Sequence, residues 1–140
     1  MNKFIFDVDG TLTPSRQVID HDFAVFFSNF CAENDVYLVT GSDKEKTVEQ
    51  LGEEIYNLCK RVYQCNGNDV WEGETHIKSD NWSLSLFVRS WLETKLKESS
   101  FPLRTGLHIE ERPGMVNFSV VGRNATIGER KLYVKYDTQH

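Results

Sequence analysis

The sequence has few cysteines, no excess of positive charge and no long apolar run. Its three cysteines, Cys31, Cys59 and Cys65, show no Cys-x-x-Cys spacing, so neither a disulfide framework nor a zinc site is indicated. The formal net charge of −5 argues against a general nucleic-acid-binding protein. No stretch is long and apolar enough to span a membrane, and the amino terminus lacks the apolar core of a signal peptide. We therefore expect a cytoplasmic protein with no membrane or nucleic-acid partner.

The chain also lacks internal repeats and low-complexity segments, and its four histidines are scattered. We interpret His21, His76 and His108 as ordinary surface or core histidines. A length of 140 residues suits one modest domain, or one domain and part of another.

The stretch from Phe4 to Thr13 organises the rest of the chain. Residues 4–6 are apolar and predict a short strand, which ends where the sequence turns polar at Asp7 and Gly10. Asp7 and Asp9 are two residues apart, which on an extended backbone places both carboxylates on one side. Like charges this close require a cation, and hard oxygen ligands favour Mg2+. A carboxylate beside Mg2+ can attack a phosphoryl group to give an aspartyl-phosphate.

An Asp-x-Asp pair also occurs in plain turns, in other metal sites and in calcium loops. A calcium-binding EF-hand loop starting at Asp7 would need Gly at its sixth position and Glu at its twelfth, where this chain has Leu12 and Val18. The residues before Asp7 also predict a strand, whereas an EF-hand needs a helix. The calcium loop is therefore the weaker interpretation.

A second polar turn follows the next predicted strand, residues 36–39. Ser42 and Glu45 fit a capping box, which predicts a helix from this turn to about Leu51, with Gly52 as its stop. Backbone N–H groups at a helix start attract anions. Because the two strands are expected to be parallel, this anion site should lie at the same sheet edge as Asp7. The alternative is a plain capped helix.

The remaining pattern predicts an α/β chain in two parts. Residues 23–31 predict a helix capped by Asp20 or Asp22 and stopped at Asn34, with a phenylalanine stripe at 23, 26, 27 and 30 in the core. Further elements are expected at 53–59 (helix), 61–65 (strand), 69–71 and 75–77 (hairpin), 81–98 (helix), 107–111 and 115–121 (strands), and a last helix opened by a capping box of Thr126 and Glu129. Strands and helices alternate only before Ser79, so we predict domains at 1–79 and 80–140.

Three arginines, Arg112, Arg123 and Arg130, stand out in the second part. Guanidinium groups bind phosphate oxygens in bidentate fashion, so several on one module would form a phosphate clamp. The alternative is ordinary surface arginines.

These stretches resemble known sequences. Asp7-Val-Asp-Gly-Thr-Leu-Thr resembles motif I of the haloacid dehalogenase superfamily of phosphotransferases, and the turn at residues 40–43 resembles its motif II. The segment Glu111-Arg-Pro-Gly-Met-Val-Asn-Phe-Ser-Val-Val-Gly-Arg-Asn resembles the cap segment of eukaryotic-type phosphomannomutases, and the resemblance extends over essentially the whole chain.

The resemblance implies a doubly wound parallel, Rossmann-like core of the haloacid dehalogenase type, with an inserted α+β cap domain that closes over the substrate. It implies Asp7 as nucleophile, Asp9 as general acid/base, and Mg2+ bound through both. Thr40, or else Ser42, would hold the transferring phosphate, and the sugar phosphate would be contacted by Arg16, Arg112, Arg123 and Arg130. The implied reaction interconverts mannose 6-phosphate and mannose 1-phosphate with a hexose bisphosphate activator, in a homodimer formed through the cap.

The sequence departs from the family pattern at three points. Thr40 stands where these mutases usually have Gly, Pro113 replaces Asn, and the chain stops at His140, before the later metal ligands. We therefore expect a truncated cap domain and keep two alternatives, a sugar-phosphate phosphatase of the same superfamily and a non-catalytic protein that retains the arginine clamp.

Overall fold

The computed structural model describes residues 2–138 and divides into two compact units, Met1–Asn81 and Trp82–His140. The division falls two residues beyond the boundary predicted at 79/80. Residues 82–85 lead into unit 2 without regular secondary structure.

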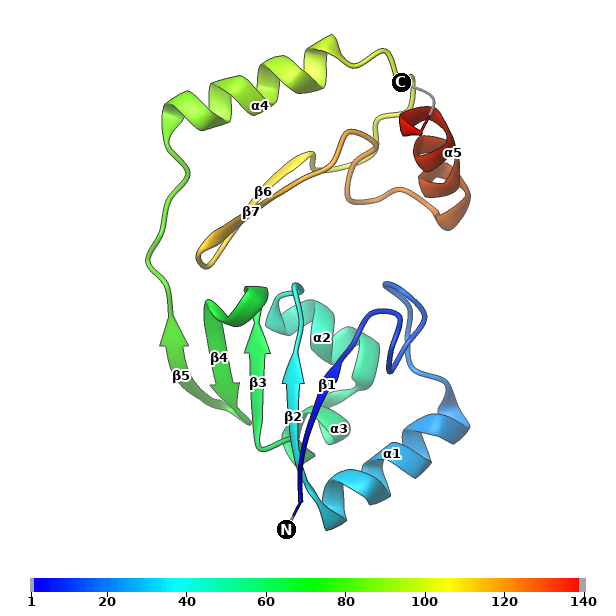
Figure 1. Ribbon diagram of the computed structural model, residues 1–140, viewed down its shortest axis with the longest axis vertical. Helices are drawn as coiled ribbons and strands as arrows, with labels where there is room; N and C mark the ends of the chain where they lie inside the picture. The colour runs from blue at the N-terminus through cyan, green and yellow to red at the C-terminus, as the bar shows by residue number, and fades with distance from the viewer. Residues whose placement is uncertain (1, 139–140) are drawn as a thin grey trace. The chain divides into compact units, whose positions relative to one another are not determined.

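Unit 1 is built on a five-stranded sheet with the strand order β1-β2-β3-β4-β5 (Figure 1). The first three strands, β1 (Lys3–Asp7), β2 (Asp35–Val39) and β3 (Arg61–Gln64), run parallel, as the alternation of strand and helix predicts. β4 (Asp69–Glu72) and β5 (Thr75–Ser79) form the predicted hairpin and are antiparallel. Asp7 pairs with Val39, so β1 and β2 end together at one edge of the sheet. The expected α/β class with a Rossmann-like parallel core is confirmed.

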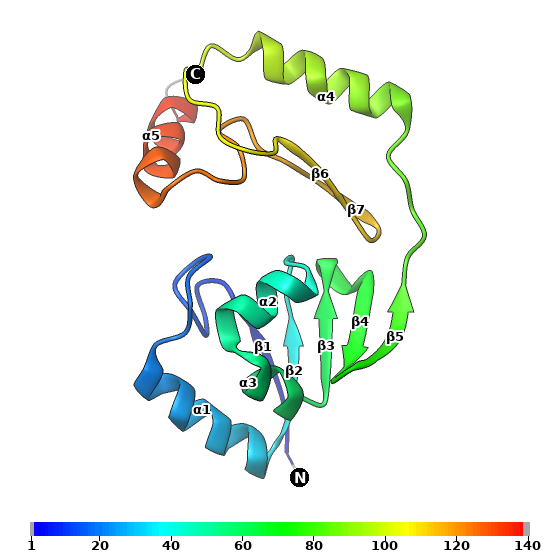
Figure 2. The ribbon, with the colours of Figure 1, turned by 180° about the vertical axis from the view of Figure 1, so that it is seen from behind.

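The helices of unit 1, α1 (His21–Glu33), α2 (Lys44–Leu51) and α3 (Glu53–Leu58), cover one face of this sheet (Figure 2). Right-handed crossovers between parallel strands that are added in one direction place their helices on the same side. A short 3-10 turn, Cys65–Gly67, follows β3. The core lies between helices and sheet, where Val36, Leu38 and Val62 are fully buried.

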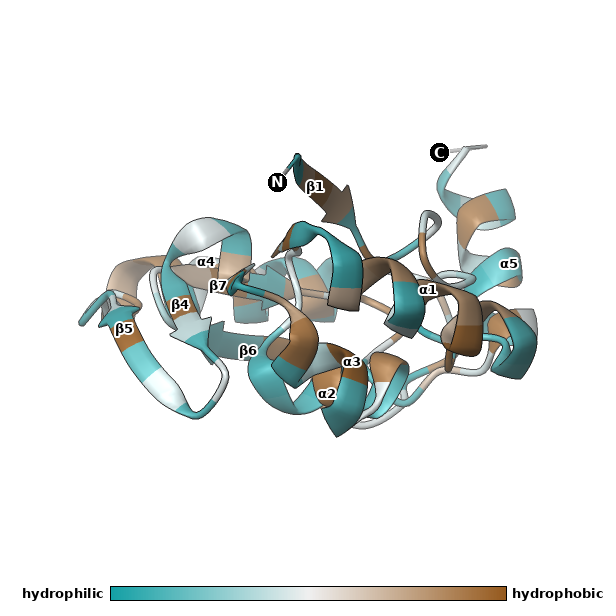
Figure 3. Ribbon diagram, turned by 90° about the horizontal axis from the view of Figure 1, so that it is seen from below, coloured by the Kyte–Doolittle hydropathy of each residue, from teal (hydrophilic) through white to brown (hydrophobic). Residues whose placement is uncertain are grey.

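Helix α1 begins and ends where the sequence predicts. The Asp20 carboxylate accepts a hydrogen bond from the Phe23 amide at 3.1 Å, and Asn34 is the C-cap. Phe27 is buried and packs edge-to-face on Phe6, with ring centroids 5.3 Å apart. The hydrophobic colour accordingly runs along β1 and recurs on α1 (Figure 3).

One member of the phenylalanine stripe does not belong to the core. Phe26 is 61% exposed, which contradicts its prediction as a core residue. It lies about 100° around the helix from Phe27, and it stacks on Phe23 with ring centroids 6.0 Å apart.

Unit 2 contains α4 (Leu86–Glu98), a two-stranded antiparallel ribbon of β6 (Ile109–Arg112) and β7 (Met115–Phe118), and α5 (Ile127–Asp137). Helix α4 starts five residues later than predicted, because Ser85 is its N-cap and accepts from the Val88 amide. The capping box of Thr126 and Glu129 at the start of α5 is confirmed. The α5 side chains Tyr133 and Tyr136 pack on the buried ring of Phe101.

The described helices reach at most 13 residues, and none combines the length and the apolarity needed to cross a membrane. The three cysteines are buried free thiols.

Candidate active site

The loop after β1 is folded tightly around one backbone carbonyl. The Val8 oxygen accepts from the amides of Thr11, Leu12 and Thr13 at 3.0–3.2 Å, and the Gly10 amide donates to the Thr13 oxygen at 2.8 Å. Gly10 has φ +78°, which L side chains rarely adopt. Val8 and Leu12 are buried and anchor the loop in the core. The same loop leaves Asp7 exposed, where its Oδ2 accepts from the Thr11 hydroxyl at 3.3 Å.

Asp9 is held more firmly than Asp7. Its Oδ1 accepts from the backbone amide of Arg16 at 2.6 Å and from the side-chain amide of Gln50 at 2.7 Å. Both donors bond the same oxygen, so they fix the orientation of the carboxylate. Arg16 reaches this position with φ +62°, uncommon for a residue other than glycine.

Gln50 is a site residue that the sequence reasoning missed. It is fully buried, and its Nε2 also lies 3.2 Å from the Thr13 hydroxyl and 3.3 Å from the Gln17 carbonyl oxygen. The available signal was a polar side chain within the helix predicted to run to about Leu51. Its partner Asp9 lies 41 residues away in the sequence, so periodicity alone could not identify the contact.

The polar turn after β2 differs in one respect from its prediction. Ser42 was expected to cap α2, but Asp43 is the N-cap and accepts from the Lys46 amide at 2.9 Å. Ser42 is held in the preceding turn, because its amide donates to the Thr40 hydroxyl oxygen at 3.1 Å and its carbonyl accepts from the Cys65 amide at 3.0 Å. The capping-box assignment is therefore wrong by one residue.

Thr40 is buried directly after the end of β2. Its backbone amide donates to the Tyr63 oxygen at 2.9 Å, and its carbonyl accepts from the Asn66 amide at 3.0 Å. The hydroxyl is thus fixed at the edge where β1 ends in Asp7. The structure brings together the strand-end carboxylates and the start of α2, and such edges of parallel sheets bind ligands.

The acidic residues of this edge suit a magnesium ion. Mg2+ is commonly held by one or two carboxylates together with substrate phosphate oxygens and water. Asp7 and Asp9 supply two carboxylates that are two residues apart in the sequence. Within residues 2–138, no group of three or more acidic, histidine or cysteine side chains gathers as a metal cage. The donor set fits an ion that is partly held by substrate and excludes a dedicated all-protein cage among these residues.

In unit 2, Arg112 and Arg123 share one carboxylate. Glu110 Oε2 accepts from Arg112 Nη2 at 3.0 Å and from Arg123 Nη1 at 2.5 Å. Two of the three predicted clamp arginines therefore lie side by side. Glu110 was not identified from the sequence, where it is one of two consecutive glutamates.

Arg130 holds the backbone of the loop that carries Arg123. Its Nη2 donates to the Arg123 carbonyl at 2.8 Å and its Nε donates to the Ala125 carbonyl at 3.1 Å. Gly122 has φ +94°, and a Cβ there would lie 1.7 Å from the Thr105 carbonyl oxygen. Glycine at position 122 therefore lets the backbone before Arg123 lie close against the backbone at Thr105. This close approach determines the position of Arg123.

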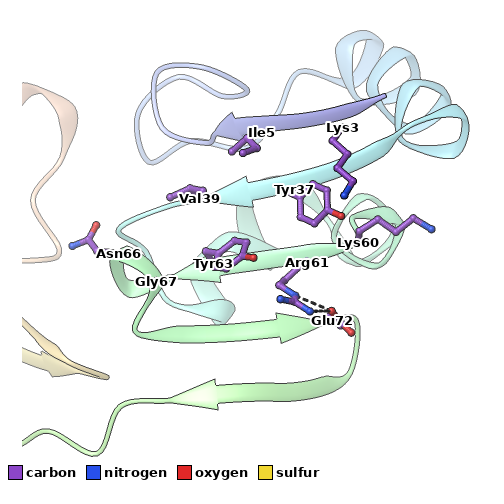
Figure 4. Close-up of a pocket in the computed structure, with 10 residues that line it drawn as sticks. All are labelled: Lys3, Ile5, Tyr37, Val39, Lys60, Arg61, Tyr63, Asn66, Gly67 and Glu72. Carbon is purple, nitrogen blue, oxygen red and sulfur yellow. Dashed lines mark hydrogen bonds and ion pairs between the residues drawn. The ribbon is translucent and has the colours of Figure 1, made fainter. Parts of the chain in front are cut away.

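The open face of the sheet in unit 1 carries a hollow of about 830 Å³ (Figure 4). Its lining includes Ile5, Tyr37, Val39 and Tyr63, which alternate with half-buried residues of β1 and with buried residues of β2 and β3. None of the predicted site residues lines it, and its centre lies along the strands rather than at their carboxyl ends (Figure 4). The hollow and the strand-end site are therefore separate features of unit 1.

The fold of this chain is similar to that of solved haloacid dehalogenase-like proteins. The crystal structure of a haloacid dehalogenase-like hydrolase from Bacteroides thetaiotaomicron superposes with a TM-score of 0.52 over 68% of this chain and 38% of that chain, at 18% identity. A likeness at this identity establishes the fold.

Sequence comparisons show the family to which this chain belongs. The profile of eukaryotic phosphomannomutases matches residues 23–140, and the chain belongs to that family. It is 35% identical over 144 aligned residues to a phosphomannomutase of Drosophila melanogaster, and 36% identical over 149 to one of Galdieria sulphuraria. Each comparison covers 97% of this chain and 57% of the relative, so the chain spans somewhat more than half the length of these relatives.

Proposed function

We propose that this chain carries phosphomannomutase-like phosphotransfer chemistry, with Asp7 as the nucleophile and mannose phosphates as substrates. The observation that supports this most directly is the loop of residues 7–13, which presents Asp7 to solvent while Asp9 is fixed two residues away. An exposed carboxylate beside a fixed one suits a nucleophile paired with an acid/base. Membership of the phosphomannomutase family supports the choice of substrate.

In the proposed reaction an Asp7 carboxylate oxygen attacks the phosphorus of a hexose bisphosphate. The bond between phosphorus and the sugar oxygen breaks, and Asp9 gives its proton to that oxygen. In the reverse direction Asp9 takes the proton from a hydroxyl of a hexose monophosphate as this oxygen attacks phospho-Asp7. A bound Mg2+ would supply charge stabilisation to the transferring phosphoryl group. Thr40, Ser42 and the start of α2 would hold the phosphate oxygens.

The hydrogen bonds of Asp9 distinguish its two carboxylate oxygens as possible carriers of the proton. Oδ1 already accepts two hydrogen bonds, which stabilise negative charge on that atom. In our proposal Oδ2 therefore carries the transferred proton. The sugar phosphate is proposed to be contacted by four arginines, Arg16, Arg112, Arg123 and Arg130. Arg130 also holds the backbone of the loop that carries Arg123.

The experiment is a phosphorus NMR time course on the 140-residue chain with Mg2+, mannose 1-phosphate and a catalytic amount of glucose 1,6-bisphosphate, alongside intact-mass detection of a phosphorylated chain. We expect mannose 6-phosphate to form and one phosphate to be trapped on the protein. Asp7→Asn should abolish both signals, and Asp9→Asn should slow turnover by about 10²–10⁴-fold.

Asp20→Asn is the matched control, because it also replaces a carboxylate by an amide, and Asn caps a helix as well as Asp does. Its turnover should equal that of the original chain. Turnover that survives in Asp7→Asn would contradict the assignment of the nucleophile. Release of free phosphate without mannose 6-phosphate would instead support a phosphatase, the second candidate, which Thr40-Gly41 favours because it resembles the Thr-Gly of related phosphatases.

The homodimer is also part of the proposal. On α4 the apolar side chains of Leu86 and Phe87 are more than 80% exposed, and Trp91, one turn on from Phe87, is 54% exposed. An apolar stripe of this kind suits a protein interface. Light scattering on the purified chain measures the oligomeric state directly.

A further inference from the structure

The two consecutive glutamates of β6 lie on opposite faces of the β6–β7 ribbon and bind different partners. Side chains alternate along a strand, so Glu110 and Arg112 share one face and Glu111 points to the other. Glu111 accepts from the Arg89 guanidinium and from the Leu84 amide, both on the α4 side of unit 2. The carboxylate of Glu110 is left to the two arginines.

The triad of Glu110, Arg112 and Arg123 is largely buried. The three side chains are 16%, 11% and 24% exposed. Two guanidinium groups this close repel each other, and a carboxylate that bonds both removes the repulsion and leaves the cluster with a net charge of +1. Both arginines bond the same oxygen, so Glu110 fixes the spacing between the two forks.

The triad also joins two separate backbone segments. Glu110 and Arg112 lie on β6, whereas Arg123 follows β7 in a loop held by Arg130 and by the close approach at Gly122. The Arg123 amide donates to the Leu107 carbonyl at 2.8 Å, which ties its backbone to the segment before β6. The Glu110 carboxylate makes the corresponding link between the side chains.

We propose that Glu110 is a positioning residue that sets Arg112 and Arg123 at the spacing needed to bind a phosphate group. The proposal rests on the proposed function in taking a sugar phosphate as the ligand. The proposal predicts a change in phosphate affinity that is opposite in direction to the change expected from electrostatics alone. Loss of a negative charge beside an anion site should strengthen phosphate binding by Coulomb attraction alone. If Glu110 positions the forks, its loss weakens binding.

The test is an NMR titration of the 140-residue chain with mannose 6-phosphate and, separately, with inorganic phosphate, following the side-chain Nε–Hε signals of Arg112 and Arg123. Glu110→Ala should weaken mannose 6-phosphate binding by about tenfold or more, the loss expected when one charge-assisted contact is misplaced. Glu110→Gln keeps an oxygen that accepts from both guanidinium groups, so it should recover part of the affinity.

Glu111→Ala is the matched control, because it removes the same charge from the neighbouring residue on the opposite face; its affinity should stay within about twofold of the original. The Arg112 and Arg123 signals should broaden or shift in Glu110→Ala before any ligand is added. Far-UV circular dichroism of each variant checks that unit 2 is folded. If Glu110→Ala does not fold, the affinity of the nearly isosteric Glu110→Gln is compared with that of the original chain and should be lower.

Equal or tighter binding by folded Glu110→Ala, or no gain in Glu110→Gln over Glu110→Ala, would overturn the positioning role. Failure of binding by the original chain would overturn the clamp itself. The proposed phosphotransfer is tested separately. If the original chain binds mannose 6-phosphate but shows no turnover and no phosphorylated chain, the phosphotransfer proposal fails, while the order of affinities among the variants still supports Glu110.

Discussion

Replacing Gln50 by methionine tests whether Asp9 is held by the buried side-chain amide. Methionine has nearly the same length and volume, so it leaves little cavity and removes mainly the polar contacts. The bond to the Asp9 carboxylate, at 2.7 Å, is worth about 1.5–3 kcal/mol as a hydrogen bond to a charged group. The contacts with Thr13 and Gln17 are longer, at 3.2 and 3.3 Å, and add about 1 kcal/mol. We expect a loss of about 2.5–4 kcal/mol in the free energy of unfolding of unit 1.

Two measurements check this expectation. Urea unfolding followed by far-UV circular dichroism gives the stability change, and hydrogen exchange at the Arg16 amide reports the site directly, since that amide bonds the same Asp9 oxygen. Exchange at Arg16 should accelerate in Gln50→Met. Glu49→Met is the control, because Glu49 is the neighbouring residue with a largely exposed side chain, and it should change stability by no more than about 0.5 kcal/mol.

A second substitution sharpens the interpretation. Gln50→Glu places a carboxylate against Asp9, so at neutral pH it should destabilise more than methionine does. On acidification the new carboxyl becomes protonated and can donate to Asp9, so part of the stability should return. A Gln50→Met variant within about 0.5 kcal/mol of the original chain, with unchanged exchange at Arg16, would refute the reasoning.

Two further predictions concern unit 2. Gly122→Ala should unfold or rearrange the Arg123 loop, because its Cβ would lie 1.7 Å from the Thr105 oxygen; the far-UV and amide NMR spectra should change, and native-like spectra would contradict the close approach. The backbone hydrogen bond from Thr126 holds the pKa of Glu129 below its ordinary value of 4.5, so its contribution to α5 is present above pH 4.5 and is lost as pH falls through the lowered pKa. Glu129→Gln should flatten this acid-induced loss of helix, measured by circular dichroism; an unchanged acid transition would count against the capping box.

The parts of the site that the sequence predicted are those set by strand ends. Asp7 and Thr40 follow apolar strands that pair in parallel, so their shared edge follows from the order of elements. The position of the α2 cap depends instead on contacts between distant segments. Ser42 accepts a hydrogen bond from Cys65, which lies after β3, and the next residue, Asp43, is the N-cap of α2.

The contacts of Gln50 and Glu110 were beyond a pattern-based prediction for the same reason. Gln50 meets Asp9 only because α2 packs beside the loop after β1. Glu110 and Glu111 are chemically identical in the sequence, and only the alternation of the ribbon assigns one to the arginines and the other to Arg89. A side chain's partner across the fold is a tertiary property, whereas the end of a strand is a local one.

The uncovered face of the sheet in unit 1 has a calorimetric consequence. Ile5 is 71% exposed and Val39 41% exposed on strands that in most parallel sheets are buried on both faces. The heat-capacity change of unfolding rises with the apolar area that folding removes from water, and averages about 12–15 cal/mol/K per residue in globular proteins. Unit 1 keeps part of that area in water while folded, so its value should lie below this average. Its stability should therefore vary less steeply with temperature than that of a sheet covered on both faces.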